Sequence, residues 1–269
     1  MVLRPIDSNE HAEPAAQPTP AWAAVAERQK QRSAGYWLIS QPDHANLSGD
    51  LAANFVSQQF PRIDALIARA IAVHDAGWAL FAPEASPAEP PLLNHDGKPL
   101  AFVEFEPEQF LRAWTASIDR AEGICPAGGI IVSRHFCELG QYRLRSPDWI
   151  GADDYDRIKA FVDRETARQE RLAQNCSYSS QELAGLLAVL QFCDLLSLYL
   201  CSGAEREVEF SQQLTDRPVR LRRQEHLYQL DPSPFQANTD LRVVSLGVSA
   251  RYFPTQVEPK LTTLAFLLC

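Results

Sequence analysis

The hydrophobic pattern divides the chain into a part with helical spacing and a part with strand-like alternation. Between residues 43 and 201, apolar positions recur with a period near 3.6 residues, as they do on one face of a helix. In the first such segment Leu47, Leu51 and Phe55 share a face, and Asp43 stands at the expected N-cap. Further helices are predicted in IDALIARAIAVHDAGW, EQFLRAWTASIDRAE, GGIIVSRHFCELG, DDYDRIKAFVDRETARQERLA and QELAGLLAVLQFCDLLSLYLC. The pattern therefore predicts about six helices.

From Glu205 onward the period shortens to that of a strand. Short alternating or apolar runs are separated by Asp, Pro and Gly, namely VEFSQQL, PVRLRRQ, HLYQL, LRVVSLGV, ARYF and TTLAFLL. Such runs are typical of an antiparallel meander. Near the N-terminus, the aromatic and branched run YWLI at residues 36–39 predicts a brief strand or extended lead-in.

These patterns predict three consecutive parts. Residues 1–34 are a Pro/Ala/Glu-rich N-terminal extension that is expected to be partly disordered. Residues 35–204 form a helical domain, and residues 205–269 form an antiparallel β subdomain packed on it. The expected fold class is mainly α, with a helical core and a C-terminal antiparallel β region.

Composition and charge narrow the classes of function. The chain has 269 residues, of which 46% are hydrophobic and 22% are charged, a mixture typical of soluble globular proteins. The formal net charge of -9 produces a field that repels nucleic acids and anionic membranes. We therefore expect neither nucleic acid nor membrane among the partners.

The cysteines and the most apolar segment indicate a cytoplasmic location. The six cysteines show no CxxC spacing and are read as free thiols in a reducing compartment. The N-terminal segment lacks the apolar core of a secretory signal. The run from Leu183 to Cys201 is apolar, but Asp194 interrupts it, and an Asp at mid-bilayer costs about 2.5–3.5 kcal/mol. A buried core helix is the cheaper interpretation.

Several imidazoles and carboxylates occupy helical positions that otherwise face the core. Asp194 lies in the most apolar predicted helix, where the charged form is costly unless it is paired. A divalent cation could neutralise it together with Asp75 and take His44, His74 and His135 as further ligands. The residue types therefore predict a metal centre.

Each of these residues also has a plainer interpretation. His44 could contact the end of its own helix, and the His74-Asp75 pair could be a helix C-terminal His beside a solvated acid. Asp194 could pair with a buried Arg, and His135 could hydrogen-bond a backbone carbonyl. The sequence leaves these alternatives open.

The spacing of His44, the pair His74-Asp75 and Asp194 resembles the HD-domain superfamily, over about residues 36–204. The runs QPDHANLSGDLA, HDAGW, IVSRHF and LDPSPF are also similar to an uncharacterised bacterial family of HD-like proteins. The resemblance implies an HD-domain-like helical core with a divalent metal ion at its centre. The metal is expected to be Mn, Ni, Co, Zn, Mg or Fe.

The superfamily most often hydrolyses phosphate esters or phosphoanhydrides, so the resemblance implies a metal-dependent hydrolase of a small phosphorylated or anionic compound. Asp75 is the expected proton-accepting carboxylate as well as a ligand. Arg134, which adjoins His135, is the expected catalytic cation that binds the phosphate.

Two alternative functions stay open. A di-iron oxygenase of the HD type needs further ligands besides His135, which Glu104, Glu106 or Asp43 would have to supply. A non-catalytic HD-like scaffold would keep the ligands for stability and use the Arg-rich run RPVRLRRQEH as a binding surface. Exposed strand edges in the β region favour pairing between subunits, so a homodimer is a candidate arrangement.

Other catalytic motifs are not indicated. A second dipeptide, His95-Asp96, lies in a proline-flanked turn, where the superfamily's helical geometry excludes it as the metal pair. Ser133 is close to His135 in sequence, but no GxSxG elbow is present. The run GICPAGG matches neither a P-loop nor a dinucleotide fingerprint.

Overall fold

The computed structural model describes residues 1–6, 18–81, 91–145, 151–236, 242–254 and 260–269. Among these residues, the α-helices are α1 (Ala21–Lys30), α2 (Gln41–Ala53), α3 (Ala65–Ala72), α4 (Pro107–Glu122), α5 (Pro126–Leu144), α6 (Ala152–Ala173) and α7 (Ser180–Ser202). Two 3-10 helices are η1 (Ala76–Leu80) and η2 (Phe102–Glu104). The strands are β1 (Val2–Pro5), β2 (Thr19–Pro20), β3 (Tyr36–Ile39), β4 (Val208–Phe210), β5 (Val219–Gln224), β6 (Leu227–Asp231), β7 (Val244–Phe253) and β8 (Leu261–Leu268).

The predicted helices and most predicted strands are confirmed as local elements. The six helices expected between residues 43 and 201 correspond to α2 through α7. The run at residues 36–39 is a strand, and each predicted β run after residue 205 contains strand residues. Hydrophobic periodicity predicted these elements because most of them bury one face, while α7 buries 15 of its 23 residues.

The prediction of a mainly α fold with a separate C-terminal antiparallel region is wrong. The described residues are 51% helix and 19% strand, and their strands form one eight-stranded mixed sheet, which makes the fold α/β. The strand order is β1-β3-β7-β8-β6-β5-β4-β2, and the pairs β2–β4 and β6–β8 are parallel. Strand alternation reveals which face is buried but not which distant strand supplies the hydrogen bonds, so the pairing was not visible in the sequence.

All three predicted parts of the chain contribute to this sheet. Residues 1–34 supply β1 and β2, residues 35–204 supply β3, and residues 205–269 supply the other strands. The antiparallel pairing of β3 with β7 joins the N-terminal and C-terminal segments. Residues 7–17 of the predicted extension lie outside the described residues.

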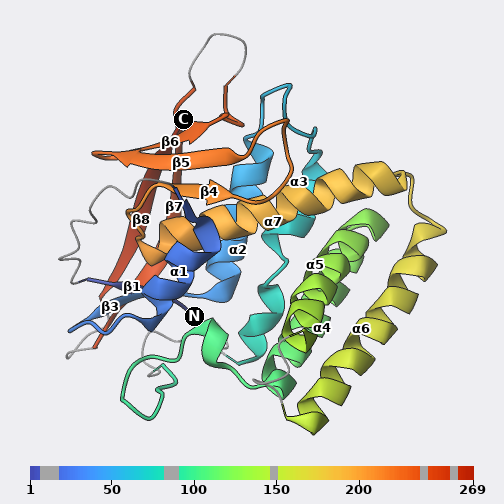
Figure 1. Ribbon diagram of the computed structural model, residues 1–269, viewed down its shortest axis with the longest axis horizontal. Helices are drawn as coiled ribbons and strands as arrows, with labels where there is room; N and C mark the ends of the chain where they lie inside the picture. The colour runs from blue at the N-terminus through green and yellow to red at the C-terminus, as the bar shows by residue number, and fades with distance from the viewer. Residues whose placement is uncertain (7–17, 82–90, 146–150, 237–241, 255–259) are drawn as a thin grey trace.

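The helix α7 lies at the centre of the molecule. Figure 1 shows it running between the sheet and the group formed by α4, α5 and α6. It packs against α1 and β1 on one side and against α2 and α5 on others. Ser179 and Glu182 form a capping box at its start, and Gly203 ends it in the left-handed conformation with φ of 68°.

The apolar length of α7 reflects burial within the protein. It is the helix among the described residues that is long and apolar enough to span a membrane, and 67% of its most apolar stretch is buried. The burial of α7 agrees with the expected core helix.

Side-chain N-caps mark where the helices α2 and α3 begin. Ser40, not Asp43, is the N-cap of α2, because Ser40 Oγ accepts a hydrogen bond from the Asp43 backbone N–H at 3.0 Å. Asp43 lies one turn inside the helix and accepts a hydrogen bond from the Ser40 hydroxyl at 2.6 Å. Asp64 caps α3 by accepting from the Ile67 N–H at 2.9 Å.

Candidate functional site

The predicted site residues come from four segments of the chain. His44 lies on α2, His135 on α5 and Asp194 on α7. His74 and Asp75 were expected on a helix, but α3 ends at Ala72, and the pair lies in the turn that joins α3 to η1. The two adjacent side chains reach different neighbours from this turn, Asp75 contacting His44 and His74 lying beside Asp194.

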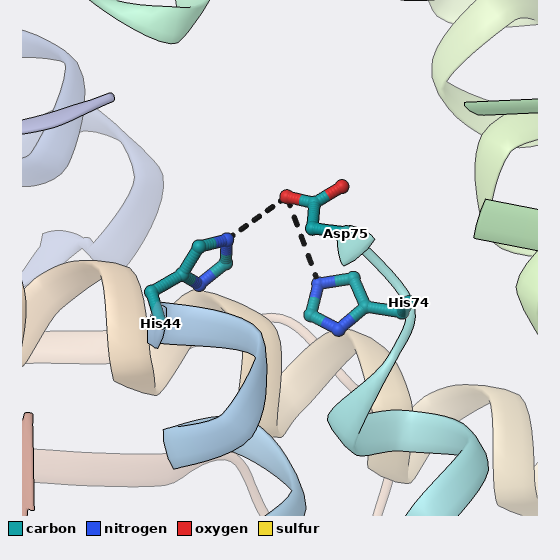
Figure 2. A group of neighbouring side chains, drawn as sticks. All are labelled: His44, His74 and Asp75. Carbon is teal, nitrogen blue, oxygen red and sulfur yellow. Dashed lines mark hydrogen bonds and ion pairs between the residues drawn. The ribbon is translucent and has the colours of Figure 1, made fainter. Parts of the chain in front are cut away.

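Asp75 is held between an imidazole and an indole. Its Oδ2 atom lies 2.9 Å from His44 Nε2, and its Oδ1 atom accepts a hydrogen bond from Trp78 Nε1 at 3.1 Å. Figure 2 shows Asp75 Oδ2 facing both His44 and His74, and the distance from Asp75 Oδ2 to His74 Nε2 is 4.0 Å. Trp78, on η1, therefore fixes the carboxylate orientation.

The second nitrogen of His44 meets α7. His44 Nδ1 lies 2.9 Å from Ser197 Oγ, which in turn lies 2.8 Å from the carbonyl oxygen of Asp194. Because a carbonyl oxygen only accepts, the Ser197 hydroxyl must donate its proton to the Asp194 carbonyl. Ser197 Oγ then accepts a hydrogen bond from His44 Nδ1. His44 then presents the lone pair of Nε2 towards Asp75.

His74 has its tautomer fixed by the backbone. Its Nδ1 atom lies 2.8 Å from the carbonyl oxygen of Ile71, so Nδ1 must donate. In the neutral ring, Nε2 therefore carries a lone pair. That atom lies 3.3 Å from Asp194 Oδ1 and, within the described structure, has no hydrogen-bond partner although it is buried. A lone pair facing a carboxylate oxygen calls for a positive charge between them.

Asp194 lies between two imidazoles. Its Oδ1 atom faces His74, while its Oδ2 atom lies 3.6 Å from His135 Nε2. No guanidinium among the described residues hydrogen-bonds or pairs with Asp194, so the alternative of a buried Arg partner finds no support there. His135 Nδ1 is buried without a hydrogen-bond partner in the same described part, so the alternative of a bond to a backbone carbonyl is not seen at that atom.

Protonation of His74 supplies a positive charge beside Asp194. Burial by itself lowers the pKa of His74, but the carboxylates of Asp194 and Asp75 outweigh it and raise the pKa to about 9. Burial by itself raises the pKa of Asp194, but His74 and the other imidazoles outweigh it and lower the pKa to about 2. Burial lowers the pKa of His135. A proton on His74 therefore neutralises Asp194.

The donor set also fits a divalent cation. One ligand atom each from His44, His74 and Asp75 lies within 4.8 Å of the others, and Asp194 adjoins this group through His74. Imidazole nitrogen and carboxylate oxygen are ligands that Zn, Mn, Fe and Ni accept. His44 and His74 are fully buried, whereas the side chains of Asp75 and Asp194 keep 12% and 15% of their surface exposed. The carboxylate side of the cluster is thus the side that reaches solvent.

The other predicted groups lie apart from the cluster. Arg134 is half-buried on α5, and no polar contact of its guanidinium with a site residue is seen among the described residues. Glu104 accepts a hydrogen bond from the Ala101 N–H at 2.8 Å, and no contact of Glu104 with an imidazole of the cluster is seen among the described residues. His95 is exposed, and Asp96 beside it pairs with Arg32 at 2.6 Å.

Sequence reasoning missed the residues that orient the ligands. Ser197 follows Asp194 by three positions on α7, a spacing that places both on one helix face. Trp78 follows Asp75 by three positions, but the 3-10 geometry of η1 was not predictable from periodicity. The helical spacing could have identified Ser197, whereas nothing in the pattern indicated Trp78.

The comparisons with known proteins add a family but no activity. No curated protein and no solved structure matches the chain. None of these comparisons links it to the HD-domain superfamily. Residues 27–249, which include every residue of the cluster, match the model of a family described as protein of unknown function (DUF3891), and the chain belongs to that family.

Proposed function

We propose that this protein is a metal-dependent hydrolase of a small phosphorylated or otherwise anionic compound, with an HD-type centre. The proposed ligands are His44, His74, Asp75 and Asp194, with His135 as the fifth. The observation that carries the proposal is the buried Nε2 atom of His74, which lies 3.3 Å from Asp194 Oδ1 without a hydrogen-bond partner in the described structure and bears a lone pair once the ring gives up its proton. A site that is built to hold a cation has this arrangement of lone pairs and carboxylates.

The chemistry follows from the open carboxylate side. A bound divalent ion would lower the pKa of a coordinated water and polarise a phosphoryl oxygen. Trp78 holds Asp75 by Oδ1, which leaves Oδ2 to bind the ion or accept a proton from the attacking water. The two buried imidazoles keep water away from the far side of the site. Arg134 remains the proposed phosphate-binding cation, on the basis of its position beside His135 alone.

A second candidate, the di-iron oxygenase, is favoured by one observation. Asp194 directs Oδ1 to His74 and Oδ2 to His135, which is the orientation of a carboxylate that bridges two ions. In the proposed hydrolase, His135 is a fifth ligand to a single ion. The number of metal ions per chain separates these two arrangements.

Metal analysis of the purified protein tests the centre. We expect about one Mn, Ni, Co, Zn, Mg or Fe ion per chain after loading and dialysis. About two irons with a visible charge-transfer band would favour the oxygenase. Absence of binding under every loading condition would leave the non-catalytic scaffold as the better account.

His74→Ala should abolish stoichiometric metal binding, because it removes the nitrogen that faces Asp194. His95→Ala is a matched control, since His95 belongs to the other His-Asp dipeptide and its side chain is 89% exposed. The control should bind metal like the parent. If His74→Ala retained the ion with parental affinity, the ligand assignment would be wrong.

Hydrolysis is tested with 4-nitrophenyl phosphate as a generic phosphomonoester. Metal-loaded protein should release 4-nitrophenol, and the His74→Ala variant should not. A metal-loaded protein that hydrolyses neither this ester nor a phosphodiester or nucleotide would contradict the hydrolase.

Location and assembly complete the proposal. The six cysteines are free thiols, which supports a reducing compartment such as the cytoplasm. A homodimer formed through the sheet edges remains part of the proposal and is tested by the mass of the protein in solution.

A further inference from the structure

Several buried polar side-chain atoms lack a hydrogen-bond partner in the part of the chain that the structure describes. Within the described residues, five buried side-chain nitrogen or oxygen atoms have no hydrogen-bond partner, and they belong to Gln41, His74, His135 and Gln212. Two of the five are the Nε2 and Oε1 atoms of Gln41. A buried polar atom without a partner costs about 1–3 kcal/mol, so such atoms call for a partner that the protein itself does not supply.

Gln41 lies on the face of α2 that supplies His44. Residues three and four apart on a helix are neighbours on its surface, which places Gln41, His44 and Ser48 on one stripe. The stripe faces α7, because both His44 Nδ1 and Ser48 Oγ lie 2.9 Å from Ser197 Oγ. The helix α2 also packs against η1, the segment that follows Asp75. Gln41 is thus one turn from the imidazole that contacts Asp75.

A comparison with Gln29 shows what a structural glutamine looks like in this protein. Gln29 is 1% exposed, and its carboxamide pairs with the backbone of Leu3, accepting from N–H at 2.8 Å and donating to C=O at 2.9 Å. Gln41 is 3% exposed, and its carboxamide has neither bond among the described residues. The packing of Gln41 therefore does not explain why a polar side chain occupies that position.

We propose that Gln41 binds the anionic group of the substrate, its Nε2 donating to an acceptor oxygen and its Oε1 accepting from a hydroxyl. This inference rests on the proposed function. A monoprotonated phosphate or phosphomonoester carries both an acceptor oxygen and a P–OH donor, so it satisfies both atoms at once. The carboxamide adds no charge to a site that already holds the carboxylates of Asp75 and Asp194.

The test measures the binding of inorganic phosphate to manganese-loaded protein by titration calorimetry. In Gln41→Leu, which keeps a similar volume without polar atoms, the affinity for phosphate should fall about 10- to 100-fold. The affinity for manganese should stay within about twofold of the parent. Gln58→Leu is the control, because Gln58 is exposed on the loop after α2, and this variant should bind phosphate normally.

The melting temperature of the metal-free variant provides a second readout. Replacement of an unpaired buried carboxamide by an apolar side chain should leave the Tm unchanged or raise it. A Tm that falls by several degrees would show that Gln41 is structural and would overturn the inference. Equal phosphate affinity in Gln41→Leu and the parent would overturn it as well.

Failure of the broader proposal has a different signature. If manganese-loaded parent protein bound no phosphate, the anionic substrate class and the role of Gln41 would both be rejected. If the parent bound phosphate and Gln41→Leu bound it equally well, only the role of Gln41 would be rejected.

Discussion

Two clusters of buried charged residues in this protein have different kinds of partner side chain. In the helical group, the fully buried Glu165 on α6 pairs with Arg164 Nε at 3.2 Å and with Arg168 Nε at 3.1 Å. In the cluster beside α7, Asp194 faces only imidazoles among the described residues. A guanidinium stays charged at any accessible pH, whereas an imidazole gains and loses its proton near neutrality.

This difference separates a structural cluster from a site. The counter-charge of Glu165 is permanent and is supplied by the chain itself, so no ion needs to bind there. The counter-charge of Asp194 is a proton on His74 in the metal-free protein, and an ion could replace it. The identity of the groups that neutralise a buried carboxylate therefore says more about whether it belongs to a binding site than its burial does.

The largest expected effect follows from Asp194→Asn. The affinity for manganese should fall by on the order of 1,000-fold, about 4 kcal/mol, because the site loses a charged ligand. The unfolding free energy of the metal-free protein at pH 7 should fall by about 2 kcal/mol, because the partner of protonated His74 is lost, and by no more than that, because His74 can then release its proton. Metal titration and chemical denaturation measure the two effects. A severe loss of stability with unchanged metal affinity would make Asp194 structural, like Glu165.

The second largest effect is expected on stability, in the cluster around Glu165. Arg168→Met removes one of the two guanidinium partners of Glu165, and we expect a loss of about 3 kcal/mol in unfolding free energy with unchanged metal binding. Arg171→Met is the matched control, since Arg171 pairs with Glu122 at the surface and should cost less than about 1 kcal/mol. Equal effects of the two variants would remove the distinction between the clusters.

A smaller effect concerns pH. The pKa of His74 is raised from 6.5 to about 9, so at pH 7 a metal ion must displace its proton. Metal affinity should therefore increase about tenfold, or 1.4 kcal/mol, for each pH unit between pH 7 and 9, and level off above that. In the metal-free protein, the stabilisation by protonated His74 is fully present below pH 6.5 and lost as the pH rises through 9. Competition with a chelator at several pH values measures the affinity, and a flat profile would contradict this account.

The sequence predicted which of these side chains lie close together better than it predicted the sheet. Helical spacing placed His44, His135 and Asp194 on core-facing positions. His74 and Asp75 reach the same place from the turn after α3, which the helical pattern did not predict. The expected phosphate-binding role of Arg134 stays a prediction, since no polar contact of its guanidinium with a site residue is seen among the described residues.

The sheet escaped prediction for a different reason. The sequence predicts a strand or extended segment at residues 36–39, but it does not predict the partners of that strand, which are Val2–Pro5 and the distant β7. Pairing depends on backbone hydrogen bonds between segments far apart in the chain, and no local pattern encodes it. The unpartnered state of Gln41 was likewise invisible, since it is a property of the packed structure alone.

The position of β3 in the sheet has a consequence for how the protein is synthesised. The helix that carries His44 begins directly after β3 and Ser40, and β3 lies in the sheet between the early strand β1 and β7, one of the last strands to be translated. During synthesis on the ribosome, β3 can pair with β1 at once but must wait for β7. The sheet around β3 is therefore complete only near the end of translation, and nascent chains truncated before β7 should lack that pairing.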